Sequence, residues 1–222
     1  MPVFDILDFL PDPQPRPAAV NMAMDEVILK EVSVPTLRTY CWLRPAVSFG
    51  CFEKYSAVEE RYAGREFVRR WTGGGVVLHG EDLTYSLAVP GSHPLARATP
   101  AQSYLSIHEA LAQALREAGI PAALTGSGAS KISNACFENA VCHDVMLGDR
   151  KIAGAAQRRT RYGLLHQGSI QGAGLPGDYA EKFAAVLAGR VNRIKPDAGI
   201  LPAALALAES KYAARKWMEK FQ

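Results

Sequence analysis

Residues 136–170 read CFENAVCHDVMLGDRKIAGAAQRRTRYGLLHQGSI, and their pattern predicts three strands in a meander. The apolar run 145–147 is the first strand, and Gly148-Asp149 suits a two-residue hairpin turn because glycine adopts a positive φ without strain. The return strand spans 150–159, and a second turn at Tyr162-Gly163 leads into the third strand at 164–170. The stretch therefore predicts a sheet built from neighbouring strands of the chain.

The return strand carries almost no side-chain bulk at its centre. Residues 152–156 read IAGAA, and a patch this small allows a ligand or another backbone to approach the sheet. Lys151 stands at the start of the strand, and Cys136 lies upstream in a predicted loop. A cation or proton acceptor and a nucleophile of these types are one arrangement that can transfer an acyl group.

Composition limits the class of protein. The chain has 222 residues, 48% of them hydrophobic and 21% charged, which fits one α/β or α+β domain with a sizeable core. The formal net charge of +3, without a long Lys/Arg run, does not favour nucleic acid as a partner. No stretch has the length of a membrane span and the start lacks a cationic signal, so we expect neither a membrane protein nor a secreted one. The four cysteines form no CxxC pair and are expected as free thiols in the cytoplasm.

Other elements follow from periodicity and turn residues. We expect a strand at 3–10 closed by the proline-rich segment 11–17, and a helix at 21–30 with Asn21 as its N-cap. The clearest helix spans 103–119, with Ser103 as its cap and Gly119 at its end. Further strands are expected at 36–42, 46–52, 67–70, 76–79 and 83–89, and further helices at 58–62, 178–187 and 201–221.

Three consecutive glycines follow a pair of arginines in RRWTGGGVVLH, residues 69–79. Glycines cost backbone entropy on folding, so this run is expected where N–H groups turn inward or a ligand lies against the main chain. The spacing matches neither the P-loop nor the dinucleotide-binding pattern. A tight turn beside a surface charge pair is the alternative.

Each single residue also has a plain structural explanation. His79 could be a half-buried histidine with its hydrogen bonds satisfied, Lys151 a solvated surface lysine, and Cys136 a small buried side chain. Cys136, Cys142 and His143 do not have the spacing of a known zinc site, so no metal site is expected.

Taken together, these stretches resemble the catalytic domain of lipoate–protein ligases, octanoyltransferases and biotin–protein ligases, in its lipoate/octanoate branch. The matching stretches are NMAMDE (21–26), PTLRTY (35–40), RRWTGGGVVLH (69–79), LTYS (83–86), DRKIAGAAQ (149–157) and HQGSI (166–170). The match also extends to Lys211, Tyr212 and Trp217 near the end of the chain. The glycine-rich GRGRxGR segment typical of biotin ligases is absent.

The resemblance implies an α+β fold similar to class II aminoacyl-tRNA synthetases and biotin ligases, a mixed and largely antiparallel sheet flanked by helices. It implies one catalytic domain over 1–222 without a C-terminal accessory domain. Lys151 is expected to contact the acyl carbonyl or an adenylate phosphate, with Cys136 as the nucleophile of a transferase. The expected substrate-binding positions are Arg70, Thr72, Gly73, Gly74, Gly75, Val77, His79, Ala153, Gly154, Ala155, His166 and Gly168.

Two activities compete within this family. An octanoyltransferase moves octanoyl from acyl carrier protein through a cysteine thioester, whereas a lipoate–protein ligase activates lipoate with ATP and Mg as lipoyl-adenylate. The ACF sequence around Cys136 and the EDLTYS segment at 81–86 favour transfer, whereas CHDV at 142–145 stands where ligases often have an Asn-Asp pair. The expected acceptor is a lysine of a lipoyl domain or of a glycine-cleavage H protein, and no permanent cofactor is expected. Arg158, Arg159 and Arg161 are candidates for docking these acidic partners. A non-catalytic lipoate-binding accessory protein is a further alternative.

Overall fold

The computed structural model describes residues 1–126 and 141–221. Its strands are β1 Phe4–Arg16, β2 Thr36–Trp42, β3 Ala46–Phe49, β4 Glu66–Arg69, β5 Val76–His79, β6 Leu83–Pro90, β7 Ala122–Leu124, β8 Val145–Leu147, β9 Arg150–Thr160, β10 Gly163–Ile170 and β11 Ala188–Arg193. Its helices are α1 Ala18–Glu31, α2 Tyr55–Arg61, α3 Pro94–Arg97, α4 Pro100–Glu117, α5 Tyr179–Leu187, α6 Ile200–Leu207, the π-helical turn η1 Ala208–Tyr212 and α7 Arg215–Met218.

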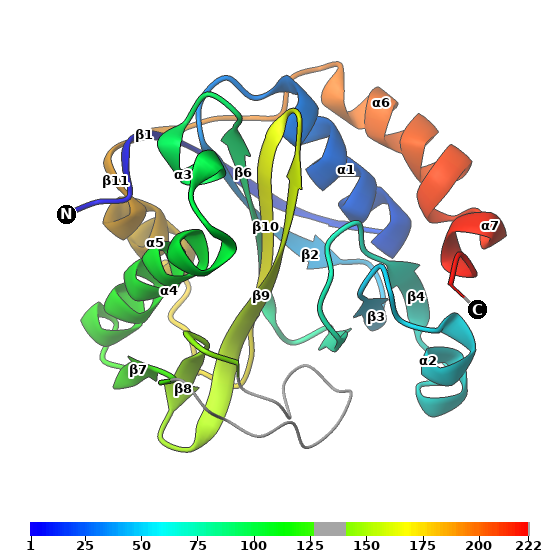
Figure 1. Cartoon of the computed structure of the whole chain (residues 1–222), viewed down its shortest axis with the longest axis horizontal. Helices are drawn as coiled ribbons and strands as arrows, with labels where there is room; N and C mark the ends of the chain where they lie inside the picture. Colours follow the sequence, from blue (N-terminus) through cyan, green and yellow to red (C-terminus); the bar gives the residue numbers. More distant parts are fainter. Residues whose placement is uncertain (127–140, 222) are drawn as a thin grey trace.

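The strands of the described residues form two sheets. The larger sheet has the order β11-β1-β2-β6-β10-β9-β8-β7, and the smaller one has the order β4-β3-β5. In the larger sheet β1 runs parallel to β2 and β11, and the remaining neighbours are antiparallel. The predicted α+β class with a mixed, largely antiparallel sheet is confirmed, and the expected meander is β8, β9 and β10 (Figure 1).

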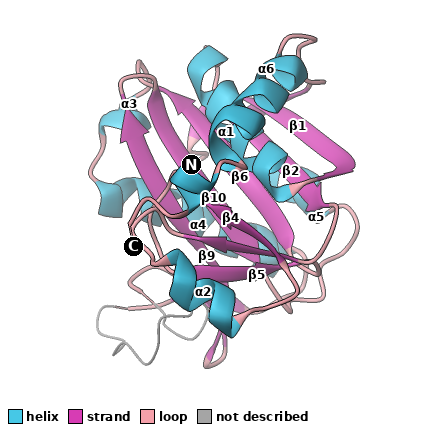
Figure 2. Ribbon diagram, turned by 90° about the vertical axis from the view of Figure 1, so that its right-hand side faces the viewer, coloured by secondary structure: helices cyan, strands magenta, loops and turns pink. Residues whose placement is uncertain are grey.

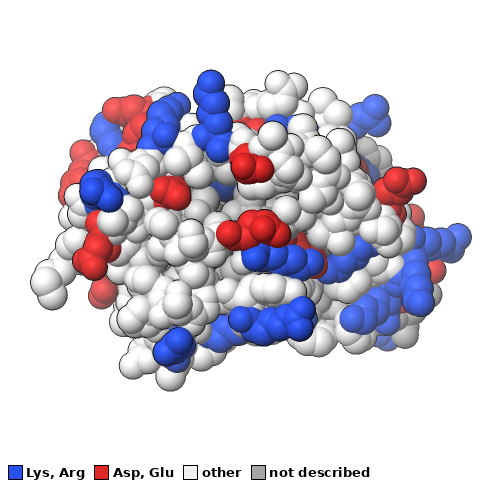
Figure 3. Space-filling view, turned by 90° about the horizontal axis from the view of Figure 1, so that it is seen from above, with Lys and Arg blue, Asp and Glu red and all other residues white. Residues whose placement is uncertain are grey.

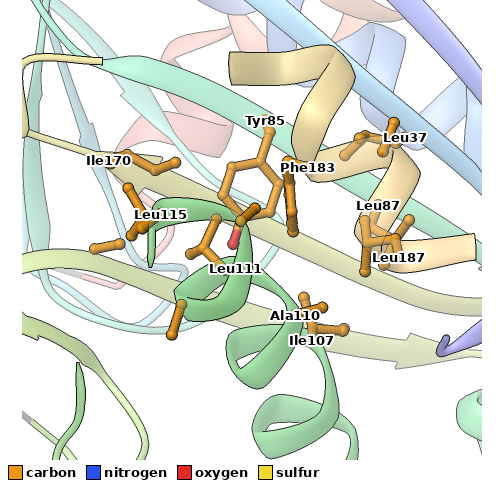
Figure 4. Close-up of a cluster of buried hydrophobic side chains, with 14 of the residues drawn as sticks. Leu37, Tyr85, Leu87, Ile107, Ala110, Leu111, Leu115, Ile170, Phe183 and Leu187 are labelled. Atoms are coloured by element: carbon orange, nitrogen blue, oxygen red, sulfur yellow. The ribbon is translucent and has the colours of Figure 1, made fainter. Parts of the chain in front are cut away.

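Helices cover both faces of the larger sheet. On one face α4 and α5 bury the main apolar cluster, where Leu111 and Leu115 meet Tyr85, Phe183 and Leu187 (Figure 4). On the other face α1 packs beside α6 (Figure 2). Among the described residues, no helix combines the length and the apolar character needed to cross a bilayer.

The start of α1 differs from the prediction. The helix begins at Ala18 after Pro17, so Asn21 lies inside it and is not the N-cap. Asn21 is fully buried; its amide nitrogen donates to the carbonyl of Cys41, and its side-chain oxygen accepts from Arg38 at 2.8 Å. The residue is polar because it joins α1 to β2, a tertiary role that local capping rules do not detect.

Helix α4 also starts earlier than expected. Thr99 caps it in a reciprocal capping box with Gln102, and Pro100 occupies the first helical turn. Ser103 is therefore an internal residue, and its hydroxyl donates to the carbonyl of Thr99. The Thr-x-x-Gln signal was present in the sequence, with Thr99 four residues upstream of the predicted cap Ser103.

Strand β1 continues through the proline-rich segment that was expected to end it. Pro11, Pro13 and Pro15 are two residues apart, so their missing N–H groups all face the same edge. The pairing with β11 ends at Phe9, and the pairing with β2 continues on the other side to Arg16. Proline is tolerated here because it removes donors only from an edge without a partner strand in the described sheet.

Helix α7 holds the end of β4, the strand that precedes the triple glycine. The Arg69 guanidinium donates to the carbonyl of Met218 and to the carbonyls of Cys51 and Glu53. In return, the indole N–H of Trp217 donates to the carbonyl of Arg69 at 3.0 Å. Residues almost 150 positions apart thus fix the end of β4, where the glycine turn begins.

Candidate acyl-transfer site

Lys151 is a buried residue at the start of β9, unlike an ordinary surface lysine. Its side chain is 3% exposed, and its ammonium pairs with the carboxylate of Asp144 at 2.7 Å. A Cβ added to Gly154 would lie 2.6 Å from Lys151 Cε and 2.8 Å from its Nζ. The ammonium therefore lies directly against Gly154, and the small residue predicted as a close-approach point is what makes room for it.

Arg70 holds the glycine turn, residues 72–75, through hydrogen bonds to its carbonyl groups. Its guanidinium donates to the carbonyls of Gly73 and Gly75, at 2.9 and 2.8 Å, and to the Ser48 hydroxyl. Gly74 has φ 80°, which a side chain would strain, and a Cβ there would lie 3.3 Å from Ala156. The turn thus packs onto the bulk-free part of β9.

Thr72 links the same turn to the sheet. Its hydroxyl donates to the side-chain oxygen of Gln167 in β10, and the Gln167 amide donates to Asp25 in α1 at 2.7 Å. Asp25 is fully buried and also accepts from Arg38 and from the Ser86 hydroxyl. A chain of buried hydrogen bonds therefore joins the turn, three strands and α1 into one rigid frame.

His79 is fixed by two partners and a stacked ring. Its Nδ1 lies 2.8 Å from Asp82, its Nε2 lies 2.7 Å from the Ser48 hydroxyl, and its ring stacks on Trp42 with centroids 4.1 Å apart. Burial alone would raise the pKa of Asp82, but His79 and the hydroxyls of Ser169 and Thr84 outweigh it and hold that pKa at about 2. Asp82 is consequently ionised across the physiological range and keeps His79 oriented.

A pocket of about 390 Å³, its opening included, lies between the two sheets and α1. Its lining is mainly uncharged and small, with Arg70 the cation among the lining residues. The lining residues are Met22, Tyr40, Trp42, Ser48, Arg70, Val77, His79, Thr84, Gly154, Ala155, Ala156, Gln167, Gly168 and Ser169.

The register of four strands explains the shape of this pocket. Gly154 pairs with Ser169, Ser169 with Thr84, and Thr84 with Tyr40. Paired residues of antiparallel strands point to the same face, so these side chains form one row across the sheet. Side-chain size increases along the row from glycine to tyrosine, which leaves room at the Lys151 side and closes the pocket at Tyr40.

Most of the residues predicted from sequence meet at this pocket. Arg70, Val77, His79, Gly154, Ala155 and Gly168 line it. Lys151 lies against Gly154, and the 72–75 turn is bonded to Arg70 and Gln167. Cys136 lies outside the described residues.

Ala153 and His166 are not brought to the pocket. Both are fully buried on the opposite face of the sheet, Ala153 in the main apolar cluster and His166 among Tyr85, Tyr104 and His108. His166 alternates with Gln167, so the strand that presents Gln167 to the pocket directs His166 away from it. The HQGSI match did not reveal which residues of the strand face the substrate side.

Sequence reasoning missed several lining residues. Met22, Tyr40 and Trp42 come from α1 and β2, which the sequence places far from the glycine turn. Ser48 and Thr84 were read only as strand residues, although LTYS at 83–86 is one of the matching stretches. Gln167 and Ser169 could have been found from strand alternation, because these two positions of HQGSI lie on the same face of the strand.

The arginines expected to dock acidic partners have internal contacts. Arg158 donates to the carbonyl of Trp71 and lies over its ring, and Arg159 donates to Ala98 and Ser103. Arg161 is exposed, but it lies beyond the far end of β9 from Lys151, about 30 Å away along an extended strand. Figure 3 shows both basic and acidic side chains on the face seen from above, with basic ones prevailing along its lower edge. Arg158 and Arg159 remain half-exposed, so a docking role for these arginines stays a prediction.

Among residues 1–126 and 141–221, no group of three His, Cys, Asp or Glu side chains is arranged to hold a metal ion.

The fold has been observed in solved protein structures. Two solved structures share the fold: a putative lipoate protein ligase from T. acidophilum with bound lipoic acid (TM-score 0.76, 20% identity, covering 99% of this chain and 100% of that one) and a lipoate-protein ligase A bound with ATP (TM-score 0.77, 19% identity, 99% and 100%). At these identities the likeness shows the fold alone.

The chain belongs to the lipoyl protein ligase A/B catalytic domain family, whose model matches residues 17–195. An octanoyltransferase LipM of Moorella thermoacetica is 39% identical over 164 residues, which cover 68% of this chain and 59% of that protein. Another from Carboxydothermus hydrogenoformans is 39% identical over 163 residues, covering 68% and 60%. The chain thus matches about 60% of the length of these curated relatives.

Proposed function

We propose that this protein transfers an octanoyl or lipoyl group to a lysine of a lipoyl domain or glycine-cleavage H protein, through a thioester on Cys136. Membership of the family and the names of the curated relatives support acyl transfer. Acyl carrier protein is the proposed donor in the octanoyl reaction. No permanent cofactor is part of this proposal.

The observation that carries the proposal is the pocket beside Lys151. An acyl chain lying over the row from Gly154 to Tyr40 would have its carbonyl at the ammonium and its tail toward Tyr40. The row crosses three strand spacings, about 14 Å, whereas seven C–C bonds of ~1.5 Å each extend no further than about 11 Å. An extended eight-carbon chain is therefore no longer than the row, and burying it would contribute about 0.8 kcal/mol per methylene.

In the first half-reaction the Cys136 thiolate attacks the carbonyl of the donor thioester. A new C–S bond forms, the donor C–S bond breaks, and the carrier thiolate leaves and takes up a proton. Lys151 stabilises the oxyanion by donating from its ammonium, which Asp144 holds in place. Cys136 itself comes from the family resemblance, since it lies outside the described residues.

In the second half-reaction the acceptor lysine, as a neutral amine, attacks the acyl-cysteine. The amide C–N bond forms, the thioester bond breaks, and the amine loses a proton as the Cys136 thiol is restored. Lys151 serves the same oxyanion, because both steps pass through a tetrahedral intermediate at one carbonyl carbon.

Intact mass spectrometry tests this function. We expect wild-type protein incubated with octanoyl-acyl carrier protein to gain one octanoyl group and Cys136→Ala to gain none. The Ala variant should also fail to octanoylate a lipoyl domain. Cys51→Ala, which removes a buried thiol outside the pocket lining, is the matched control and should keep the adduct.

The alternatives give different results in the same assay. A Cys136→Ala variant that modifies the acceptor from free lipoate with ATP and Mg²⁺ would identify an ATP-dependent ligase. Lipoate binding without modification of any acceptor, under either condition, would identify an accessory protein.

A further inference from the structure

Asp144, the partner of Lys151, is a fully buried carboxylate whose orientation depends on its donors. Its Oδ2 contacts the Lys151 ammonium at 2.7 Å and accepts the backbone N–H of Val141 at 2.7 Å. Its Oδ1 accepts the hydroxyl of Tyr104. Because no part of the side chain is exposed, water does not compensate for a lost donor.

Tyr104 reaches this carboxylate from α4, on the face of the sheet opposite the pocket. Burial, and then the charge of Asp144, raise the pKa of Tyr104 well above its ordinary value, so the hydroxyl keeps its proton and donates. The same oxygen accepts the backbone N–H of Ala155 at 3.0 Å, and Ala155 lines the pocket. The Tyr104 hydroxyl therefore joins Asp144, the partner of Lys151, to strand β9, which lines the pocket.

A second residue of α4 holds the backbone of the turn at residues 141–144, which carries Asp144. His108 lies one helical turn after Tyr104, their rings are 4.0 Å apart, and its Nδ1 donates to the carbonyl of His143 at 2.7 Å. His143 has φ 71°, a left-handed conformation that costs a non-glycine residue energy and needs support from its surroundings. Helix α4 thus fixes the backbone of this turn through His108 and its carboxylate through Tyr104.

We propose that Tyr104 is a positioning residue for acyl transfer: it holds Oδ1 of Asp144 so that Oδ2 keeps the Lys151 ammonium against Gly154. It does not touch the substrate. This inference rests on the proposed function, and it adds a residue of α4 that no sequence motif indicated. It requires that loss of the hydroxyl lowers turnover more than it weakens substrate binding, because every side chain of the pocket lining is kept.

Tyr104→Phe tests the proposal with octanoyl-acyl carrier protein as donor and a lipoyl domain as acceptor. We expect kcat to fall about 10- to 100-fold, the range for a hydrogen bond to a charged group, with KM nearly unchanged. Tyr85→Phe is the matched control, since it removes a buried hydroxyl that contacts His166 in the same cluster and has no contact with Asp144. Equal kinetic effects of the two variants would overturn the proposal.

A double-mutant cycle with Asp144→Asn separates positioning from a general structural effect. If Tyr104 acts through Asp144, Tyr104→Phe should add little once Asp144 is changed, whereas independent effects would multiply and contradict the proposal. Should Tyr104→Phe fail to fold, 3-fluorotyrosine at position 104 keeps the ring and hydroxyl and changes only the donor strength. An unchanged kcat in that protein would count against the proposal. A wild-type protein that octanoylates no acceptor would instead refute the proposed function itself.

Discussion

At the scale of single residues, the site depends on where a side chain is missing. Gly154 provides the space that the Lys151 ammonium fills, and Asp144 Oδ1 would lie 3.2 Å from an added Cβ. Gly168 lacks a side chain for a different reason, because a Cβ there would lie 2.2 Å from the rigid ring of Tyr85. The two glycines of neighbouring strands therefore serve a cation on one face and the core on the other.

Gly154→Ala should separate activity from stability. The added methyl meets the flexible end of Lys151, which can move aside, so the fold should persist while the ammonium leaves its place against the pocket. We expect kcat/KM for octanoyl transfer to fall about 100-fold, as for the loss of one oxyanion donor, with the urea midpoint nearly unchanged.

The control for this change is Gly177→Ala. Gly177 has no atom within 4 Å of the added methyl, so the variant should keep wild-type activity and stability. A Gly154→Ala protein with full activity would show that the position of the Lys151 ammonium does not matter for transfer.

At the scale of elements, the pocket is closed by strand β2 and helix α1, not by the glycine turn. Trp42 is held at this end by two contacts, the stack on His79 and the bond from its indole N–H to Thr84 at 2.7 Å. Tyr40 beside it is buried and bonded to Asp25. The register of β2 against β6 consequently sets how far an acyl tail can extend.

Trp42→Ala should lengthen the acyl chain that the protein accepts. The ratio of kcat/KM for dodecanoyl over octanoyl donors should rise at least about tenfold, because each extra buried methylene contributes ~0.8 kcal/mol. Competition between the two donors, read by mass spectrometry of the acceptor, measures this ratio. Leu43→Ala removes an exposed neighbour outside the pocket lining and should leave the ratio unchanged. The same shift in both variants would argue against Trp42 as the end wall.

At the scale of the whole molecule, the larger sheet separates two environments. One face carries the pocket and α1, and the other carries the apolar core with α4 and α5, in which His108 and His166 are fully buried. Burial lowers the pKa of His108 to about 4 and that of His166 well below its ordinary value. Both rings are therefore neutral in the folded protein at neutral pH.

Acid should destabilise the fold through these histidines. The unfolded chain binds protons at a pKa of about 6.5, and folded His108 only near 4, so stability present above about pH 6.5 is lost as the pH falls toward 4. For His108 alone the loss approaches about 3 kcal/mol. Urea unfolding measured across this range should give a shallower pH dependence for His108→Gln than for wild type. Parallel curves for the two proteins would contradict this account.

The sequence by itself determined most of the secondary-structure elements. The meander β8–β10, the bulk-free strand and the glycine turn follow from local patterns, because turn residues and strand alternation act over a few positions. The role expected of Lys151 came from the family resemblance. Boundaries that depend on distant partners were less predictable. Asn21 was read as a cap because its true partners, Arg38 and Cys41, lie on strand β2, away from helix α1 in the sequence.

Only the tertiary structure decided which residues form the pocket. The row Gly154, Ser169, Thr84, Tyr40 exists because strands distant in sequence pair in one register, and register cannot be read from any one strand. The same pairing directs His166 into the core and Gln167 to the pocket. The burial of Lys151 likewise depends on Asp144 and Gly154 together, since an ammonium is stable away from water only beside a charge that compensates it.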